Sequence, residues 1–209
     1  MTVTYAVAAE VLRRLAAAAH VATPGVEVRA GWRRVARVVR RPEGFKVVIG
    51  PVLLTASELV VMGVLAHEVT HIALGHRAMF QRLKVGAIAA IVLASIAFFA
   101  LFTLQLLHGT GNWWLWVIEV VAWLALTFTP RLILLAIARR EEFEADRKAA
   151  TLLGSPDPVI AFLDWVATLT RDNRWPIPLR PWMSTHPSLA ARREAMLRSH
   201  VSISSGGQS

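Results

Sequence analysis

The sequence predicts a mainly α-helical protein with a small β-sheet and a two-helix transmembrane hairpin. Residues 85–107 are 23 consecutive positions without a charged side chain, about 35 Å as a helix, which is long enough to span a bilayer. Between Val26 and Arg41, branched residues alternate with arginine, a pattern typical of short strands. Segment 5–20 places its apolar residues at helical spacing, and Ser57 followed by Glu58 is a typical helix start.

The composition is that of an apolar but basic chain. Of the 209 residues, 55% are hydrophobic, and the mean hydropathy of +0.49 is too high for an ordinary soluble domain. The 23 Lys and Arg outnumber the 14 Asp and Glu, which fits a membrane protein whose charged residues face anionic lipid headgroups. No nucleic-acid-binding motif is recognisable, so we expect the lipid bilayer and no nucleic acid as a partner. Because cysteine is absent, any metal must be held by histidine and carboxylate.

The N-terminal region is expected to form one amphipathic helix followed by two or three short strands. The helix should cover residues 5–20 and end before Thr23-Pro24-Gly25. Segment 45–50, FKVVIG, is expected to be an edge strand along which an extended peptide can pair. The arginines of segment 29–41 are expected to form a solvated or headgroup-facing surface.

Residues 67–71 read His-Glu-Val-Thr-His. Histidines four positions apart lie on the same helix face, where the imidazoles of His67 and His71 can both reach one metal ion. Glu68 lies about 100° around the helix, where it can take a proton from a water bound to that metal. Uncharged residues flank the motif on both sides, which indicates a buried helix. The pattern is typical of a zinc hydrolase, although two ordinary helical histidines remain the alternative at this point.

A second apolar segment, 113–131, completes the predicted hairpin. Lys and Arg flank both outer ends, whereas the turn at 108–112 has none, so the positive-inside rule places both ends in the cytoplasm. Pro130-Arg131 is expected to end the second span, so that segment 132–138 packs in the cytoplasmic core. Glu119 within this span is expected to contact the partner helix.

The predicted organisation is a cytoplasmic domain divided by the hairpin. If the spans leave the membrane near Lys84 and Arg131, both helices continue for about 17–20 Å, and the residues beyond the hairpin can meet the HEVTH helix. The expected parts are an N-terminal half of the catalytic domain over 1–84, the hairpin over 85–131 (spans about 85–107 and 113–131), the C-terminal half over 132–200, and a disordered tail over 201–209.

A zinc site formed by two histidines and a water lacks one protein ligand. Four carboxylates follow the hairpin, and the residues alone leave the choice among them open: Glu141, Glu142, Glu144 and Asp146. Further along, residues 184–189 read Ser-Thr-His-Pro-Ser-Leu, with Arg192 shortly after.

The order of these motifs resembles the HtpX-like and CAAX-prenyl-endopeptidase group of integral-membrane zinc proteases, which are gluzincins. In that group HExxH is followed by a transmembrane hairpin and then by a helix bearing ExxxD, which corresponds here to Glu142 and Asp146. The resemblance spans about residues 57–198 and implies a zincin-like α+β catalytic domain. It also implies that Glu142 is the third zinc ligand and that Asp146 orients a ligating imidazole. Glu141 and Glu144 are then expected to be solvated.

The resemblance extends to the Ser-Thr-His-Pro segment. It implies that His186 lies beside the zinc and donates a hydrogen bond to the developing oxyanion, while Arg192 anchors the helix that follows. His76, five residues past His71, is expected to lie off the ligand face.

The expected function is therefore that of a membrane-bound zinc endopeptidase, an integral membrane protein of the cell membrane with its catalytic domain and both termini in the cytoplasm. One zinc ion per chain is held by His67, His71 and Glu142, with Glu68 as the base. The HtpX-like resemblance implies misfolded or membrane-associated polypeptides as substrates. The alternative is a non-catalytic zinc-binding membrane protein that acts as a sensor or assembly factor. Catalysis is favoured because structural zinc sites are usually closed by four protein ligands.

Overall fold

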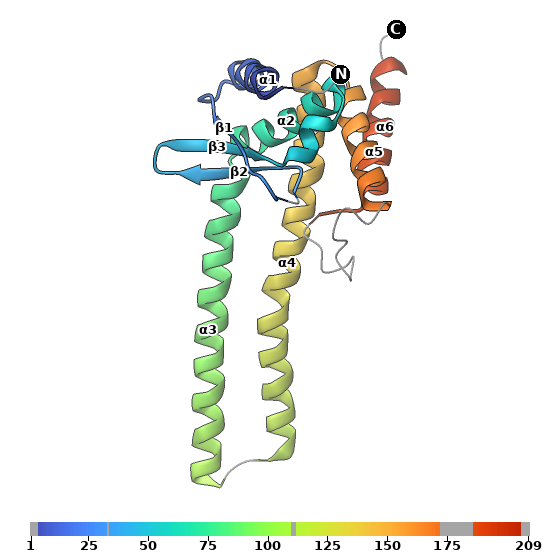
Figure 1. Ribbon diagram of the computed structural model, residues 1–209. Coiled ribbons are helices and arrows are strands. Elements are labelled where there is room, and N and C mark those ends of the chain that lie inside the picture. Colours follow the sequence, from blue (N-terminus) through green and yellow to red (C-terminus); the bar gives the residue numbers. More distant parts are fainter. Residues whose placement is uncertain (1–3, 33, 110–111, 172–185, 206–209) are drawn as a thin grey trace. The chain divides into compact units, whose positions relative to one another are not determined.

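The computed structural model describes residues 4–32, 34–109, 112–171 and 186–205, and the chain divides into two compact units. One unit combines the residues up to His76 with those from Arg139 onward, and the other is segment 77–138 (Figure 1). The prediction of a mainly helical protein with a small sheet and a two-helix hairpin is confirmed.

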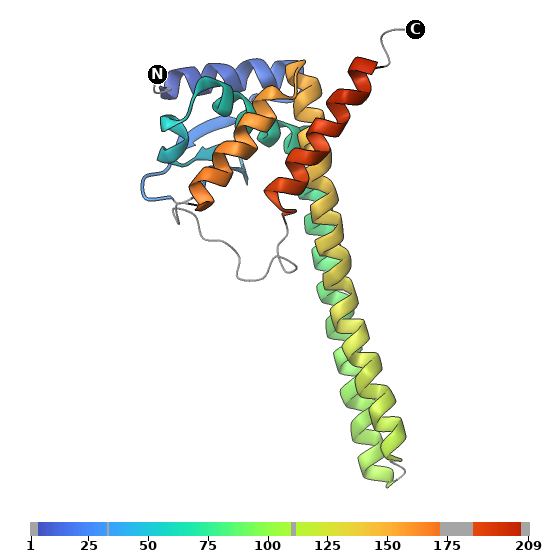
Figure 2. The same ribbon diagram turned by 90° about the vertical axis from the view of Figure 1, so that its right-hand side faces the viewer.

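The first unit contains the sheet and most of the shorter helices. Its elements are α1 (Tyr5–Ala18), β1 (Gly25–Val28), β2 (Ala36–Arg41), β3 (Gly44–Ile49), the 3-10 helix η1 (Pro51–Thr55), α2 (Glu58–Ala73), the C-terminal part of α4 (Trp113–Leu153), α5 (Asp157–Arg171) and α6 (Leu189–Ser205). Segments that are far apart in the sequence lie side by side in this unit (Figure 2).

The sheet has the strand order β1-β3-β2, with β1 parallel and β2 antiparallel to β3. The prediction that segment 45–50 forms an edge strand is therefore wrong. Strand β3 is central because β1 pairs with one side of it and β2 with the other, and β2 takes an edge position. Val38 of β2 and Val47 of β3 are paired and fully buried, which fixes the apolar face of the sheet toward the core.

Helix α2 is the central helix of the first unit. Ser57 caps its N-terminus by accepting a hydrogen bond from the Val60 N–H. The helix ends at Ala73, because Gly75 adopts φ +65°, a left-handed conformation that glycine tolerates best. Gly63 allows α5 to approach closely, since a Cβ at this position would collide with the carbonyl oxygen of Pro158.

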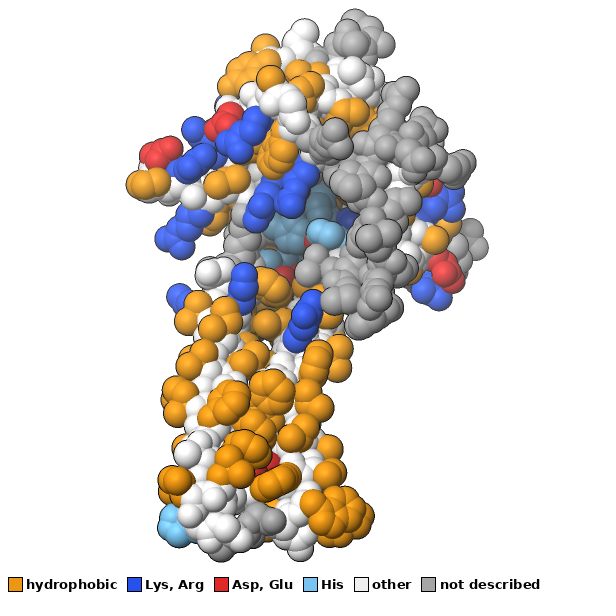
Figure 3. Space-filling view, turned by 60° about the horizontal axis from the view of Figure 1, so that its bottom comes forward, with side chains coloured by type: hydrophobic (Ala, Val, Ile, Leu, Met, Phe, Trp, Pro, Cys, Tyr) orange, Lys and Arg blue, Asp and Glu red, His pale blue; other side chains and the backbone are white. Residues whose placement is uncertain are grey.

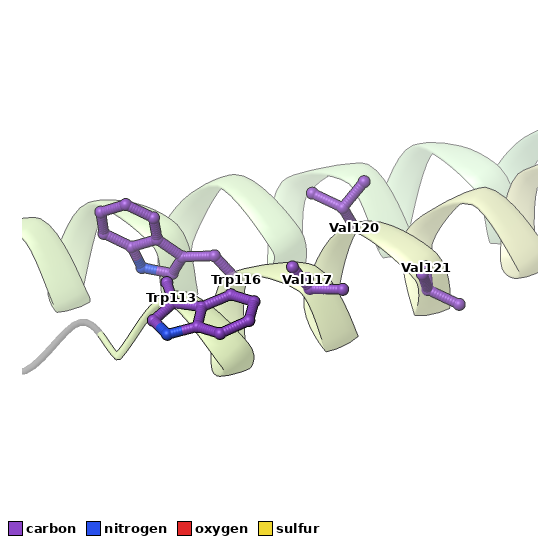
Figure 4. A pocket seen from close by; sticks show the side chains of 5 residues that line it. All are labelled: Trp113, Trp116, Val117, Val120 and Val121. Atoms are coloured by element: carbon purple, nitrogen blue, oxygen red, sulfur yellow. The ribbon is translucent and has the colours of Figure 1, made fainter.

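The second unit is a helical hairpin formed by α3 (His76–His108) and the N-terminal part of α4. Both helices are long and apolar enough to cross a membrane, and their most apolar stretches have no buried residues. Hydrophobic side chains cover the hairpin surface (Figure 3). Near the turn, Trp113, Trp116 and three valines of α4 line an open apolar hollow (Figure 4). These are features of a surface that faces lipid, with tryptophan near its end.

Polar contacts hold the two hairpin helices together. The Trp123 Nε1–H donates a hydrogen bond to Ser95 Oγ at 3.1 Å. Gln105 Nε2 of α3 donates to Glu119 Oε1 of α4, so the prediction that Glu119 contacts the partner helix is confirmed. Such partly buried polar pairs help to fix the register of two apolar helices.

Helix α4 contains Pro130, beyond which segment 132–138 differs from the sequence prediction. The helix continues through this proline, and a long apolar helix can accept the loss of one backbone hydrogen bond. Leu132 and Ile133 are 56% and 53% exposed, so segment 132–138 does not pack in the core as predicted; Ala138 is its one buried residue. The second compact unit ends at Ala138, and the end of the second membrane span near Arg131 stays a prediction.

The C-terminal helix also differs from the prediction. Helix α6 extends to Ser205, into the segment 201–209 that was predicted to be disordered. The rest of that segment, residues 206–209, lies outside the described residues.

Candidate metal centre

The HEVTH motif lies on α2 and presents its two histidines to the same point. His67 and His71 are one helical turn apart, and their Nε2 atoms lie 3.1 Å from each other. The rings are perpendicular, with centroids 4.6 Å apart, and His67 is only 6% exposed. Burial above all, and the neighbouring His67, lower the pKa of His71 to about 3, so His71 is neutral at pH 7 and has a lone pair available for a metal.

Helix α4 brings a carboxylate to the same point. Glu142 Oε2 lies 3.6 Å from His67 Nε2, and Glu142 Oε1 lies 3.6 Å from His71 Nε2. One potential ligand atom from each of these three residues lies within 4.8 Å of the others, and within the described part of the chain no second group of this kind occurs. Glu142 is buried, and although burial acts to raise its pKa, the nearby His186, His67 and Arg192 hold that pKa well below its usual range.

This donor set fits zinc. Two imidazole nitrogens and one carboxylate oxygen are the protein ligands of a catalytic zinc site, which leaves its fourth position open. Glu142 Oε2 is buried and accepts no well-aligned hydrogen bond, although the guanidinium of Arg192 lies close to it. A cation between the three residues would complete the coordination of this oxygen.

Asp146 lies one turn after Glu142 and contacts the first histidine. Its Oδ1 atom is 2.9 Å from His67 Nδ1, so the ring nitrogen on the side away from the cluster has an acceptor. Burial acts to raise the pKa of Asp146, but the hydrogen bonds from Arg192 and His67 outweigh it and lower the pKa to about 2. An ionised Asp146 therefore holds the proton of His67 on Nδ1 and leaves Nε2 free to bind a metal.

Arg192 of α6 connects both carboxylates of α4. Its Nε and Nη2 atoms donate to the two oxygens of Asp146 at 2.7 and 2.6 Å, and Nη1 lies 2.9 Å from Glu142 Oε2. The side chain is almost completely buried. The planar guanidinium, with two hydrogen bonds to Asp146 and an ion pair with Glu142, anchors α6 to α4 in a way that lysine could not reproduce.

Removing the guanidinium should destabilise the protein strongly. We expect Arg192→Leu to lower the free energy of unfolding by about 3–5 kcal/mol, because two buried carboxylates lose their counter-charge. The neighbouring Arg193 is a matched control, since its ion pair with Asp164 is exposed. Arg193→Leu should cost about 1 kcal/mol or less. Thermal unfolding of the purified variants in one detergent measures both, and equal losses would contradict the structural role of Arg192.

Glu68 lies beside the open edge of the sheet. Its Oε2 atom accepts a hydrogen bond of 2.8 Å from the backbone N–H of Val38 on β2. Because the Val38 N–H donates to Glu68, it points away from β3. It therefore faces the outer side of β2, where an additional strand could pair. The base candidate of the motif therefore lies between the metal ligands of α2 and a sheet edge.

His186 also reaches the cluster. Its Nδ1 atom lies 3.0 Å from Glu142 Oε1, and its side chain is exposed. Figure 3 shows histidine side chains near the centre of this face, close to Lys and Arg side chains, and also at the far end of the hairpin. The preceding Ser184 and Thr185 of the motif lie outside the described residues.

The structure thus brings together the seven site residues predicted from the sequence. It also places His76 beside them, a residue that was predicted to lie off the ligand face. His76 is 5% exposed, and its Nδ1 atom lies 3.1 Å from His71 Nδ1. The signal that could have found it is Gly75, which ends α2 and turns the chain back before α3 begins. His76 Nε2 in turn lies 3.6 Å from Glu144 Oε2, while Glu144 itself is exposed as predicted.

Glu141 is a second correction. It was expected to be solvated but is only 8% exposed. Burial, with a contribution from Glu142 and Glu144, raises its pKa to about 7. The reason is the position of Glu141 on the buried side of α4, directly before the candidate ligand.

An HExxH helix, a glutamate from a later helix and an apolar hairpin between them in the sequence are the arrangement expected of a membrane metallopeptidase of the zincin type. The chain belongs to peptidase family M48, whose family model matches residues 8–199. It is 30% identical over 158 residues to a protease HtpX homolog of Campylobacter hominis, covering 73% of this chain and 54% of that protein. The predicted resemblance is confirmed, and the family together with the two apolar helices indicates a membrane protein.

The fold is also similar to a solved structure. The crystal structure of S. mikatae Ste24p matches with a TM-score of 0.54 at 20% sequence identity, over 89% of this chain and 49% of that chain. The present chain therefore spans about half the length of both relatives.

Proposed function

We propose that this protein is a membrane-bound zinc-dependent endopeptidase that hydrolyses internal peptide bonds of polypeptides. The observation that carries the proposal is the convergence of His67, His71 and Glu142, with Glu68 on the same helix as the metal-binding histidines. Structural zinc sites are usually closed by four protein ligands, and this cluster offers three with a base beside them. Membership of peptidase family M48 supports the same reaction.

The residues of the site have distinct roles in this proposal. Zinc would supply Lewis-acid chemistry, polarising a peptide carbonyl and making water acidic enough to ionise near neutral pH. Glu68 accepts the proton of the attacking water and passes it to the leaving amine. His186 is exposed beside Glu142. It donates a hydrogen bond to the negative charge that develops on the oxygen of the attacked peptide carbonyl. Asp146 and Arg192 hold the ligands in place.

The substrate is proposed to bind as an extended strand along the edge of β2. The free side of this edge faces Glu68, as the hydrogen bond from Val38 indicates. A peptide that pairs there would present its backbone to the base without requiring a particular sequence. This favours unfolded or flexible segments, such as those of misfolded or membrane-associated proteins.

Removal of the metal tests the proposed activity. The purified full chain in detergent should cleave casein, lose at least about 90% of this activity with a zinc chelator, and regain it when stoichiometric zinc is added, because the ligands alone cannot polarise the carbonyl. Protein that binds zinc stoichiometrically but cleaves neither casein nor other unfolded polypeptides would instead favour the sensor or assembly-factor alternative.

We further propose a multi-pass topology with both termini and the first unit in the cytoplasm. Lys and Arg flank the outer ends of the hairpin, whereas its turn carries none. The chain has no cysteine, so single cysteines can be introduced without background. In intact cells, a membrane-impermeant maleimide should label Asn112→Cys at the turn, and should label the exposed His20→Cys only after permeabilisation. Labelling of His20→Cys in intact cells would reverse the proposed orientation.

A further inference from the structure

His71, the second histidine of the candidate metal site, contacts His76. The two Nδ1 atoms lie 3.1 Å apart, and the rings meet edge to face with centroids 5.3 Å apart. His76 is the first residue of α3 and is buried. The turn at Gly75 brings it back against the HEVTH helix.

The direction of this hydrogen bond follows from the cluster. His71 Nε2 is the nitrogen that faces His67 Nε2 and Glu142 Oε1, so it is the nitrogen available to a metal. A neutral imidazole that binds a metal through Nε2 carries its proton on Nδ1. His71 Nδ1 must then donate to His76 Nδ1. The opposite direction would put the proton of His71 on Nε2 and block the site.

The same reasoning fixes the tautomer of His76. Because its Nδ1 accepts, its own proton lies on Nε2, and this nitrogen faces Glu144 Oε2 at 3.6 Å. The carboxylate attracts the Nε2–H and opposes rotation of the ring. His76 is not itself placed as a ligand, because its contact is with the nitrogen of His71 that points away from Glu142.

We propose that His76 is a positioning residue for the metal centre: it fixes the tautomer and orientation of His71, and Glu144 supports it from α4. The proposal rests on the proposed function, since it assigns a role toward the same metal. His76 would hold the proton of His71 on Nδ1, as Asp146 holds the proton of His67 on Nδ1. Partners of this kind usually change metal affinity by about 10–100-fold when they are removed.

Zinc affinity of the full chain in detergent, measured by competition with a chromophoric chelator, tests the proposal. His76→Phe keeps an aromatic ring but has no acceptor, and zinc affinity should fall by about 10–100-fold. His76→Asn places an amide oxygen close to the position of Nδ1, so it should restore most of the affinity. His108→Phe, the same change at an exposed histidine at the other end of α3, should leave the affinity unchanged.

The cobalt-substituted protein gives a second readout that packing alone would not change. The visible absorption bands of bound Co²⁺ depend on ligand orientation, and they should shift in His76→Phe but not in His76→Asn. Unchanged affinity and spectrum in His76→Phe would overturn the proposal while the proposed function stands. Equal losses in both variants would also overturn it, because the hydrogen-bond acceptor would then not be what matters. If the wild-type protein does not bind stoichiometric zinc, both this proposal and the proposed function are overturned.

Discussion

Replacing Glu68 by glutamine should abolish peptide hydrolysis and leave zinc binding intact. Glutamine has nearly the same shape and can still contact the backbone at Val38, but it cannot accept a proton from water. The side chain does not belong to the cluster of three ligands, so the metal should remain. We expect casein cleavage to fall by about 10²–10⁴-fold, the usual contribution of a general base.

Glu58 provides the matched control for this variant. It lies in the first turn of the same helix, is exposed, and precedes the motif by more than two helical turns. Glu58→Gln should therefore keep both zinc and activity. Metal content by mass spectrometry and cleavage of a fluorescent casein should be measured on the same preparations. Undiminished proteolysis by Glu68→Gln would remove Glu68 from its assigned role.

Replacing Glu142 by alanine should remove the zinc. The carboxylate is the one ligand that α4 contributes to the cluster, and two histidines alone leave a tetrahedral site with too few protein ligands. The zinc content should fall from about one ion per chain to near zero after dialysis, and activity should fall with it. Arg192 would also lose one of its two carboxylate partners, so some loss of thermal stability is expected.

The adjacent Glu141 is the control that makes this result specific. It is buried as Glu142 is, but it does not belong to the cluster. Since its pKa is raised to about 7, the neutral isostere in Glu141→Gln should be tolerated, and zinc should remain stoichiometric. Stoichiometric zinc in Glu142→Ala would show that another carboxylate is the ligand.

The parts of the fold and site that the sequence predicted are those set by local spacing. The interval between His67 and His71 matches one helical turn, and Ser57 carries the capping interaction that its position implies. The hairpin follows from uninterrupted apolar segments. The pairing of Glu142 with these histidines spans more than 70 positions, and only the resemblance to a family indicated it.

The parts that the sequence did not predict depend on contacts between distant segments. Strand β3 was assigned to an edge because its own residues do not show that β1 pairs with its second side. His76 was set aside because a continuous helix would carry it off the ligand face, whereas Gly75 breaks that helix. Segment 132–138 was assigned to the core although its own residues do not show which segments would cover it.

We propose that His67, His71 and Glu142 together hold one zinc ion. X-ray absorption at the zinc edge, measured on the purified full chain, tests it most directly. We predict two imidazole ligands at about 2.0–2.1 Å with oxygen in the remaining positions, and loss of the ordered zinc signal in Glu142→Ala. Three or more imidazoles, or an unchanged spectrum in Glu142→Ala, would contradict the account.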